Sequence, residues 1–307
     1  MQSDGIFQGI PDKGKLLTKI SLFWFNKLHH IIPNHFVTAT IDEMPEEIRK
    51  YKDQLDGRTM LVRKAEVIPL EAIVRGYIVG TPFFSFISKS HKFVTDFFLL
   101  GSAWSEYKKF GTVHSIPMPA GLVEGQKLPK PLFTPSTKAE QGAHDENISP
   151  EQGKKINVPP SFSETNTEFF FIAAKLIGQD LYDKISSVAL RLYEEAADYA
   201  QVRGVILADT KFEFGHVSNG LEKELILIDE LLTPDSSRYW PLEEYAPGKA
   251  QPSFDKQYVR DWLVSAGYQK GLESGPAGKE GQGWFIDEKI VKGTQERYAE
   301  AVNLLVG

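Results

Sequence analysis

The 307-residue sequence contains no cysteine, which excludes disulfides, thiolate metal sites and cysteine nucleophiles. It has no apolar run of about eighteen residues, so no membrane-spanning helix is expected. Its first residues lack the basic and apolar stretches of a signal peptide. Acidic residues outnumber basic ones by 41 to 35, and the net charge of −6 disfavours a general nucleic-acid-binding protein. Together these absences predict a cytoplasmic protein that binds neither nucleic acid nor a membrane.

The sequence does contain a hydrophobic fraction of 41%, which is enough for a buried core. The spacing of apolar residues predicts helices at 15–28, 181–201, 255–265 and 287–305. A strand is expected at 61–68 and continues toward Gly76, while the proline- and glycine-rich stretch 115–136 is expected to be an ordered loop. Helices and strands mixed in this way indicate the α+β class.

A polar pattern near residue 210 is the most informative local feature. Asp209, Lys211 and Glu213 are two positions apart, so a β-strand places all three on one face. Phe212 and Phe214 then lie on the other face, where they can be buried. The strand is therefore predicted to separate a charged face from the core.

A second apolar run ends in Asp229 and Glu230, and a turn-forming stretch then leads to Arg238. If the two strands are neighbours, they present several carboxylates and a lysine together. Hard oxygen ligands beside a cation suit Mg²⁺ and a polyphosphate. The alternative is a pair of amphipathic hairpin strands with a solvated charged face. Because the carboxylates cluster at strand ends beside the turn, a functional site is the preferred interpretation.

Five stretches of the chain also resemble, in the same order, the signature sequences of the SAICAR synthetase (phosphoribosylaminoimidazole-succinocarboxamide synthase) family of purine-pathway ligases. They are Ile68–Gly80, Leu132–Glu140 with His144–Asn147, Leu207–Gly215, Leu227–Trp240 and Asp255–Trp262. One short motif would be weak, but five in the family's order are specific. The resemblance runs from about Gly9 to the C-terminus and is of the fungal type.

The resemblance implies a two-lobed α+β architecture related to ATP-grasp enzymes. Residues 1–68 would be a remnant of the N-terminal ATP-binding lobe, and residues 69–307 would form the C-terminal lobe for substrates and metal. Family members open with a further segment whose strand turn contacts ATP phosphates. No counterpart of that turn is found here, so the N-terminal lobe is expected to be incomplete. The alternative interpretation is an inactive truncated fragment, or a mis-spliced product that retains only nucleotide or substrate binding.

The implied reaction uses ATP to join L-aspartate to the carboxylate of carboxyaminoimidazole ribonucleotide, giving SAICAR, ADP and phosphate. Mg²⁺ is the implied cofactor, and these small molecules are the implied partners of a monomeric enzyme. The physical task is to neutralise charge on the transferring phosphoryl group, so no protein nucleophile is expected. A kinase-like phosphotransferase is a more distant alternative, because no loop resembling His-Arg-Asp is present.

The resemblance also assigns roles at the centre of the site. Lys211 would meet the ATP phosphates or the transferring phosphoryl group, and Asp209 would orient Lys211, which makes these two the catalytic candidates. Glu213 and Asp229 are the metal candidates, with Glu230 as an alternative ligand. For Lys211, the alternative of an ion pair with Asp209 or Glu213 and no ligand role remains open.

The remaining implied contacts are to the substrates. Arg75 and Arg238 would clamp the ribonucleotide 5′-phosphate, since a guanidinium meets phosphate bidentately. The other substrate-binding candidates are Ser102, Ser136, Thr137, Lys138, Ser236, Lys256 and Gln257. The candidates for ATP are Lys64, Glu66, Val67 and Asp229.

Two segments depart from the family pattern, at 81–101 and 153–172. The second interrupts a helix that Ser149 would otherwise begin, and Pro159-Pro160 cannot continue it. Both segments can be encoded by intron-like strings, and their removal restores the family sequence. They are therefore interpreted as non-native inserts, with a genuine lineage-specific loop as the alternative.

Overall fold

The computed structural model describes residues 9–80, 103–114, 116–137, 176–220, 222–254, 257–267 and 284–307. The two expected inserts at 81–101 and 153–172 lie outside these residues, as does the interrupted helix start at Ser149. In the described part, helices and an antiparallel sheet share one core, which confirms the expected α+β class. No helix among the described residues is long and apolar enough to cross a membrane.

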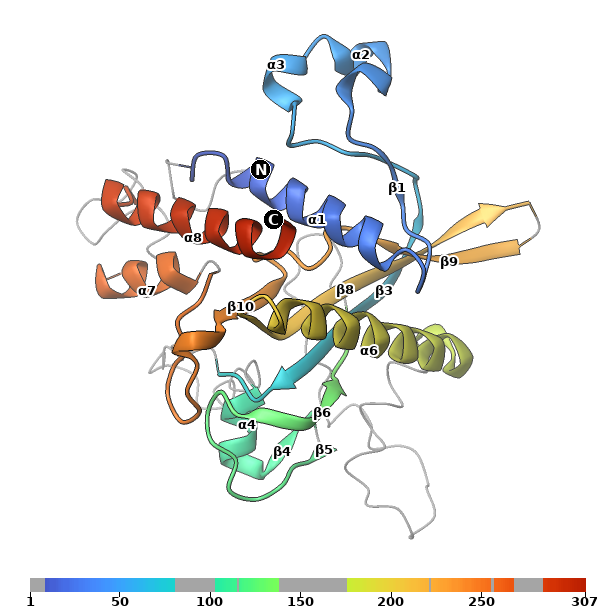
Figure 1. Ribbon diagram of the computed structural model, residues 1–307. Helices are drawn as coiled ribbons and strands as arrows, with labels where there is room; N and C mark the ends of the chain where they lie inside the picture. The colour runs from blue at the N-terminus through green and yellow to red at the C-terminus, as the bar shows by residue number, and fades with distance from the viewer. Residues whose placement is uncertain are drawn as a thin grey trace, which may run out of the picture.

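A six-stranded antiparallel sheet forms the centre of the molecule (Figure 1). Its strands are β3 (Glu66–Tyr77), β6 (Lys127–Phe133), β7 (Ser136–Thr137), β8 (Val205–Asn219), β9 (Glu222–Ile228) and β10 (Ser237–Pro241). The order across the sheet is β10-β8-β3-β6, while β7 pairs with β3 and β9 pairs with β8. The two longest strands, β3 and β8, are therefore neighbours and extend along each other.

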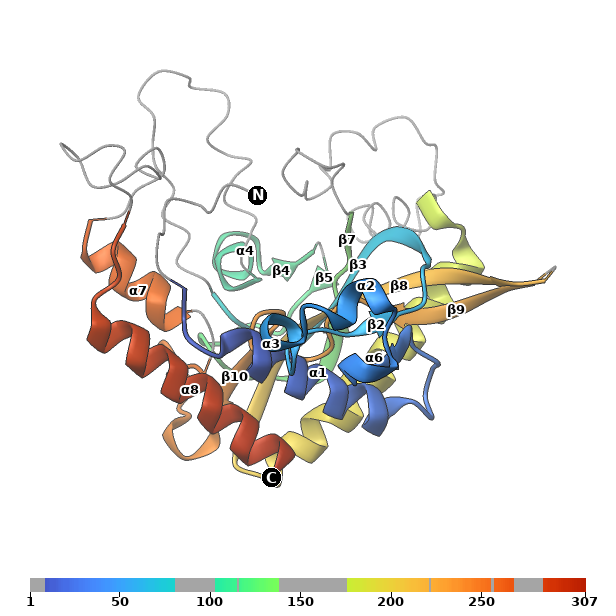
Figure 2. The ribbon, with the colours of Figure 1, turned by 90° about the horizontal axis from the view of Figure 1, so that it is seen from above.

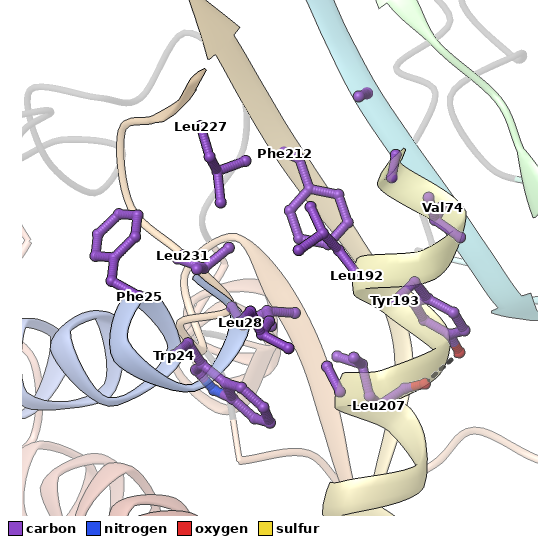
Figure 3. Packing of buried hydrophobic residues seen from close by; sticks show 14 of the residues in the cluster. Trp24, Phe25, Leu28, Val74, Leu192, Tyr193, Leu207, Phe212, Leu227 and Leu231 are labelled. Carbon is purple, nitrogen blue, oxygen red and sulfur yellow. Dashed lines mark hydrogen bonds between the residues drawn. The ribbon is translucent and has the colours of Figure 1, made fainter. Parts of the chain in front are cut away.

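Three helices cover one face of this sheet (Figures 1 and 2). They are α1 (Lys13–Leu28), α6 (Gln179–Gln201) and α8 (Glu288–Val306). Their apolar stripes meet the inward side chains of β8, and Phe212 and Phe214 are fully buried in that cluster, as the alternation predicted. Figure 3 shows Trp24, Leu192 and Phe212 packed in this layer. Burying each such side chain contributes about 2 kcal/mol.

A bulge in β8 sets the direction of the polar residues. The pairing of β10 with β8 shifts between Arg238 and Tyr239. On the N-terminal side of the shift, Leu207 packs with the helices. Beyond it Phe212 does so, which leaves Asp209 and its alternating neighbours on the opposite face. Bulges of this kind re-aim side chains and occur beside active sites.

Smaller elements flank the sheet. Beyond β3, α4 (Ala103–Phe110) and the hairpin of β4 (Thr112–Val113) and β5 (Ile116–Pro117) pack around a separate apolar cluster. Near the N-terminus, β1 (Phe36–Thr38) pairs with β2 (Leu61–Val62), with the short helices α2 (Glu46–Arg49) and α3 (Lys52–Leu55) between them. The last helix pair is α7 (Gln257–Ser265) and α8.

The four predicted helices are confirmed as α1, α6, α7 and α8, with ends that differ by one or two residues. The predicted ordered loop at 115–136 is wrong, because it contains β6. Pro129 and Pro131 misled the prediction, yet an edge strand tolerates prolines since one side of it has no ladder. The predicted strand at 61–68 is interrupted at 63–65, between β2 and β3. The division of the chain at residue 68 stays a prediction.

Candidate active site

The register of β3 and β8 places charged residues opposite one another. Glu71 pairs with Glu213, and Arg75 pairs with Asp209. Lys211 lies between them on β8 and faces the same way, since residues two apart share a face. We call these five residues the polar face. It lies on the side of the sheet opposite the helical layer, because Phe212 and Phe214 point into that layer.

Lys211 is held between two carboxylates at the centre of the polar face. Its Nζ lies 3.0 Å from Glu71 Oε1 and 2.8 Å from Glu213 Oε1. Burial lowers the pKa of the Lys211 ammonium, but the hydrogen bonds to Glu213 and Glu71 outweigh burial and raise that pKa above its ordinary value. Lys211 is therefore a fixed positive charge near neutral pH. The two glutamates tolerate their close approach because this charge lies between them.

A serine from β7 completes the centre of the polar face. Ser136 pairs with Glu71 across the sheet, and its Oγ donates to Glu71 Oε2 at 3.0 Å. Glu71 therefore uses one oxygen for Lys211 and the other for Ser136. Its side chain is buried, so both contacts fix its orientation. Thr137 pairs with Leu70 in the same short ladder, and only its backbone is described.

Two guanidinium groups converge on one carboxylate at the far end of the polar face. Arg75 Nη1 lies 3.2 Å from Asp209 Oδ2, and Arg238 donates to the same oxygen. Arg75 Nε also donates to Thr134 Oγ1 at 3.0 Å. Burial lowers the pKa of Arg75 while Asp209 opposes that shift, and an arginine stays charged regardless. The paired guanidinium groups provide several N–H donors, which suit a phosphate.

A histidine and a glutamate from the neighbouring subdomain extend this end. Burial and the charge of Arg75 lower the pKa of His114 to about 3, so this imidazole is neutral near pH 7. His114 has a left-handed backbone, with φ 49°, in the turn between β4 and β5. Glu106 of α4 is buried, accepts from Thr112 Oγ1 at 3.1 Å, and raises the pKa of Arg75. The region around Arg75 is therefore more polar than the sequence suggested.

The loop from β9 to β10 borders the polar face on its other side. Glu213 pairs with Ile228 at the end of β9, and Asp229 follows as an exposed residue with φ 63°. Within the loop, the carbonyl of Ser236 accepts from the Lys211 backbone N–H at 3.2 Å. The loop thereby brings Asp229 and Ser236 next to the centre of β8.

Glu230, the alternative ligand, is hydrogen-bonded within the same loop. It accepts a hydrogen bond from the hydroxyl of Thr233. Burial raises the pKa of Glu230, with the Thr233 hydrogen bond acting in the opposite direction. Glu230 thus has a hydrogen-bond partner inside the loop, whereas the side chain of Asp229 beside it is exposed.

In the described part of the chain, no three histidine, aspartate or glutamate side chains form a group that could hold a metal ion. Mg²⁺, however, is usually held by only one or two protein carboxylates, together with phosphate oxygens and water. Glu213 and Asp229 fit this smaller donor set, because one closes the β8 face and the other begins the adjoining loop. The residues present therefore suit a cation that a nucleotide also ligates.

The ATP candidates Lys64, Glu66 and Val67 lie at the opposite end of β3 from Arg75. All three are exposed, and Glu66 pairs with Lys223 at 2.6 Å. On β3, Glu66 and Arg75 are 75 − 66 = 9 positions apart, or roughly 30 Å at about 3.3 Å per residue. The three candidates are thus well separated from the arginine pair, with Lys211 between them.

Some of the predicted site residues cannot be compared with the structure. Ser102, Lys138 and Lys256 lie outside the described residues. Gln257 begins α7, but its side chain is also outside the described part. Of the others, the structure brings together Arg75, Ser136, Asp209, Lys211, Glu213 and Arg238 through the contacts given above.

The sequence interpretation missed Glu71, Thr134 and His114. Glu71 could have been found, because it is four positions from Arg75 on one strand and shares its face. That is the rule that identified Asp209 and Lys211. Thr134 and His114 carry no such signal, since loop or turn geometry brings them to Arg75.

Comparisons with known proteins agree with this arrangement. Residues 3–274 match the family model described as SAICAR synthetase. The phosphoribosylaminoimidazole-succinocarboxamide synthase of Pichia angusta is 46% identical over 97% of this chain and 83% of its own length. The protein of the same name from Maridesulfovibrio salexigens is 44% identical over 96% and 81%. The solved SAICAR synthase from Saccharomyces cerevisiae, complexed with SAICAR, is 39% identical with a TM-score of 0.72, over 100% and 86%.

An ATP-dependent carbon–nitrogen ligase is therefore the class of protein to which the fold and these relatives point. The chain belongs to the SAICAR synthetase family. It couples L-aspartate to carboxyaminoimidazole ribonucleotide with ATP in purine biosynthesis. Since the chain spans 83% of the Pichia relative, the comparisons do not favour the alternative of an inactive fragment.

Proposed function

We propose that the ligase reaction takes place on the polar face, with its reactants laid out along β3. The adenine of ATP binds near Lys64, Glu66 and Val67, and the ribonucleotide 5′-phosphate binds at Arg75 and Arg238. The phosphoryl group is transferred between these ends, at Lys211. The observation that carries this proposal is the half-buried lysine held by two carboxylates beside a pair of arginines that share one aspartate.

At the centre, Lys211 acts as a fixed cation. Attack of the ribonucleotide carboxylate on the γ-phosphorus of ATP forms an acyl phosphate and releases ADP. The aspartate amine then attacks the acyl carbon, and phosphate leaves. Both steps build negative charge on phosphoryl oxygens, and a preorganised ammonium stabilises that charge. Asp209 orients Arg75 and Arg238. It thereby also orients the reacting carboxylate of the ribonucleotide.

Glu213 and Asp229 are the proposed ligands for Mg²⁺. An ion held by these two residues would neutralise part of the negative charge of the ATP phosphates. Asp229 is exposed and ready to bind a cation. Glu213 is oriented by its hydrogen bond with Lys211, which holds its carboxylate on the polar face.

The remaining candidates are proposed contacts for the ribonucleotide and aspartate. Ser136 lies on Glu71 at the centre of the face, and Ser236 adjoins Lys211 through its carbonyl. Ser102, Thr137, Lys138, Lys256 and Gln257 keep the roles that the family resemblance implies. A monomer, a cytoplasmic location and a lobe boundary at residue 68 are likewise proposals.

The test of this proposal is an Arg238→Gln variant assayed with each substrate varied in turn. Loss of one charge-assisted contact to phosphate, worth about 2 kcal/mol, raises the KM for the ribonucleotide roughly 30-fold. The KM for ATP stays unchanged, because ATP binds at the other end of β3. Arg203→Gln is the matched control, since Arg203 stacks on Tyr199 in the helical layer. An unchanged ribonucleotide KM in Arg238→Gln would refute the phosphate assignment.

A further inference from the structure

The loop between β9 and β10, residues 229–236, has a backbone conformation that depends on contacts with the rest of the protein. Asp229 has φ 63° and Leu232 has φ 51°, although neither is glycine. Residues other than glycine rarely adopt this left-handed backbone conformation, and it persists only where the surroundings impose it. The same loop carries Asp229 and Ser236 and leads directly into Arg238. Its conformation is therefore a requirement of the proposed site.

Contacts inside the body of the protein hold the first half of the loop. The Leu231 backbone N–H donates to Ser21 Oγ of α1 at 3.2 Å. The Tyr239 hydroxyl donates to the Leu232 carbonyl at 2.7 Å. Both Ser21 and Tyr239 are buried, so these contacts are shielded from water. The core thereby fixes Leu231 and Leu232.

In the second half of the loop, the carboxylate of Asp235 connects the loop to helices α1 and α8. Lys13 Nζ, at the start of α1, lies 2.7 Å from Asp235 Oδ2. The Tyr298 hydroxyl, on α8, donates to Asp235 Oδ1 at 2.6 Å. Lys13 Nζ also lies 5.2 Å from the centre of the Tyr298 ring, within the range of a cation–π contact. We call Lys13, Asp235 and Tyr298 the clasp.

The clasp joins parts of the chain that are far apart in sequence. Helices α1 and α8 lie side by side in both views of the molecule (Figures 1 and 2). Tyr298 is 1% exposed, so its hydroxyl is oriented by packing and not by solvent. The side chains of Lys13 and Asp235 are 29% and 24% exposed, which leaves their attraction only partly screened.

We infer that Tyr298 and Lys13 are positioning residues of the ligase, which act through Asp235 on Ser236 and Arg238. This inference rests on the proposed roles of Ser236 and Arg238. Asp235 precedes Ser236, whose carbonyl accepts from the backbone of Lys211. A loop that is released at Asp235 therefore loses its register at the centre of the polar face. Displacements of about 1 Å are enough to reduce turnover strongly.

The inference is tested with Tyr298→Phe and a matched control, Tyr199→Phe. Each tyrosine hydroxyl donates a hydrogen bond that connects α8 to the rest of the molecule. The Tyr199 hydroxyl lies 3.0 Å from the Leu305 carbonyl of α8. Only Tyr298 reaches the loop. We expect Tyr298→Phe to raise the ribonucleotide KM roughly fivefold, as loss of one hydrogen bond predicts. Tyr199→Phe lowers the melting temperature and leaves that KM unchanged.

The lysine provides an independent arm in case the tyrosine variant folds poorly. Lys13→Met removes the ion pair, and we expect the same rise in ribonucleotide KM. Lys13→Arg keeps a cation at the position and restores the wild-type KM. In the double variant of Lys13→Met and Tyr298→Phe, the rise is smaller than the product of the two single effects, because both act through Asp235.

Two outcomes separate this inference from the proposed function. If Arg238→Gln raises the ribonucleotide KM while Tyr298→Phe and Lys13→Met do not, the clasp inference is overturned and the phosphate assignment stands. If Arg238→Gln has no effect, the proposed site itself is wrong. Equal effects of Tyr298→Phe and Tyr199→Phe on KM and melting temperature would reduce the clasp to a stabilising contact.

Discussion

We propose two separable roles for Lys211, one in the chemistry and one in folding. It neutralises Glu71 and Glu213, which face each other across the β3–β8 ladder. We expect Lys211→Met to reduce kcat about 100-fold or more, because a preorganised charge is lost from the phosphoryl-transfer centre. The melting temperature should fall too, since like charges directly opposite in a sheet repel.

A second substitution separates these roles. The double variant of Lys211→Met and Glu71→Gln removes the repulsion, so we expect it to recover most of the lost stability without recovering turnover. Thermal melting and ADP release measured on the two variants provide the comparison. A Lys211→Met chain with near wild-type kcat would mean that the lysine forms a structural ion pair and has no ligand role.

The lowered pKa of His114 predicts that the protein becomes less stable as the pH falls. Burial and Arg75 lower its pKa from 6.5 to about 3, so the unfolded chain binds a proton below pH 6.5 that the folded chain does not. Stability is therefore lost as the pH falls from 6.5 toward 3, by at most about 1.4 kcal/mol per pH unit. We expect His114→Gln to reduce the loss of stability between pH 7 and pH 5, measured by urea unfolding. His29→Gln, at an exposed helix end, should leave it in place.

At the scale of single residues, the alternation rule predicted much of the site. It placed Asp209, Lys211 and Glu213 on one face and buried Phe212 and Phe214, and the structure confirms both. The convergence of Arg75 and Arg238 on Asp209 was not predictable in that way. It depends on strand order and on the β8 bulge, and neither has a local sequence pattern.

At the scale of elements, β3 and α6 approach closely behind Arg75. A Cβ added to Gly76 would lie 1.9 Å from the Tyr193 hydroxyl oxygen. That hydroxyl donates to the Leu207 carbonyl at 2.6 Å (Figure 3). We expect Gly76→Ala to destabilise the protein by about 1–3 kcal/mol, as overpacking does.

Because Arg75 is the adjacent residue, the same change should also raise the ribonucleotide KM. Gly9→Ala is the control, since an added Cβ there meets nothing within 4 Å. Urea unfolding and steady-state kinetics of the two variants test this contact. Equal unfolding free energies for both variants would show that β3 and α6 accommodate the added methyl group without loss of stability.

Element boundaries show where sequence patterns lose their power. Strand β6 was missed because its prolines suppress the strand signal, although its edge position tolerates them. Helices α1, α6 and α8 were predictable, because each presents a long apolar stripe to one core. Local signals are strong where an element is half buried and regular, and weak where an edge or a bulge decides the outcome.

The segments 81–101 and 153–172 remain a prediction at this scale. If they are encoded by introns, mature messenger RNA lacks both, and a chain without them is more soluble because the six phenylalanines of the first segment are removed. Sequencing the transcript across Gly80 and Gln152 tests this interpretation. Dominant transcripts that retain both segments, or a lower melting temperature after deletion, would show that they are genuine protein.

At the scale of the whole molecule, the sheet separates two tasks. One face packs α1, α6 and α8 into a core, and the other presents the polar face. The clasp connects the two, because helices from both ends of the described chain hold the loop that borders the site. The family resemblance predicted the reaction, whereas the separation of the core-packing face from the polar face became evident only from the packing.

SAICAR synthesis on the polar face, with Glu213 as a proposed metal ligand, can be tested directly. SAICAR and ADP formation is measured for the purified chain and for Glu213→Gln over a range of Mg²⁺ concentrations. We expect equimolar SAICAR and ADP from the wild-type chain, and at least a 100-fold lower rate at saturating Mg²⁺ in Glu213→Gln, with its fold retained by circular dichroism. Turnover by Glu213→Gln at the wild-type rate with the same Mg²⁺ dependence, or no SAICAR from the folded wild-type chain, would contradict this expectation.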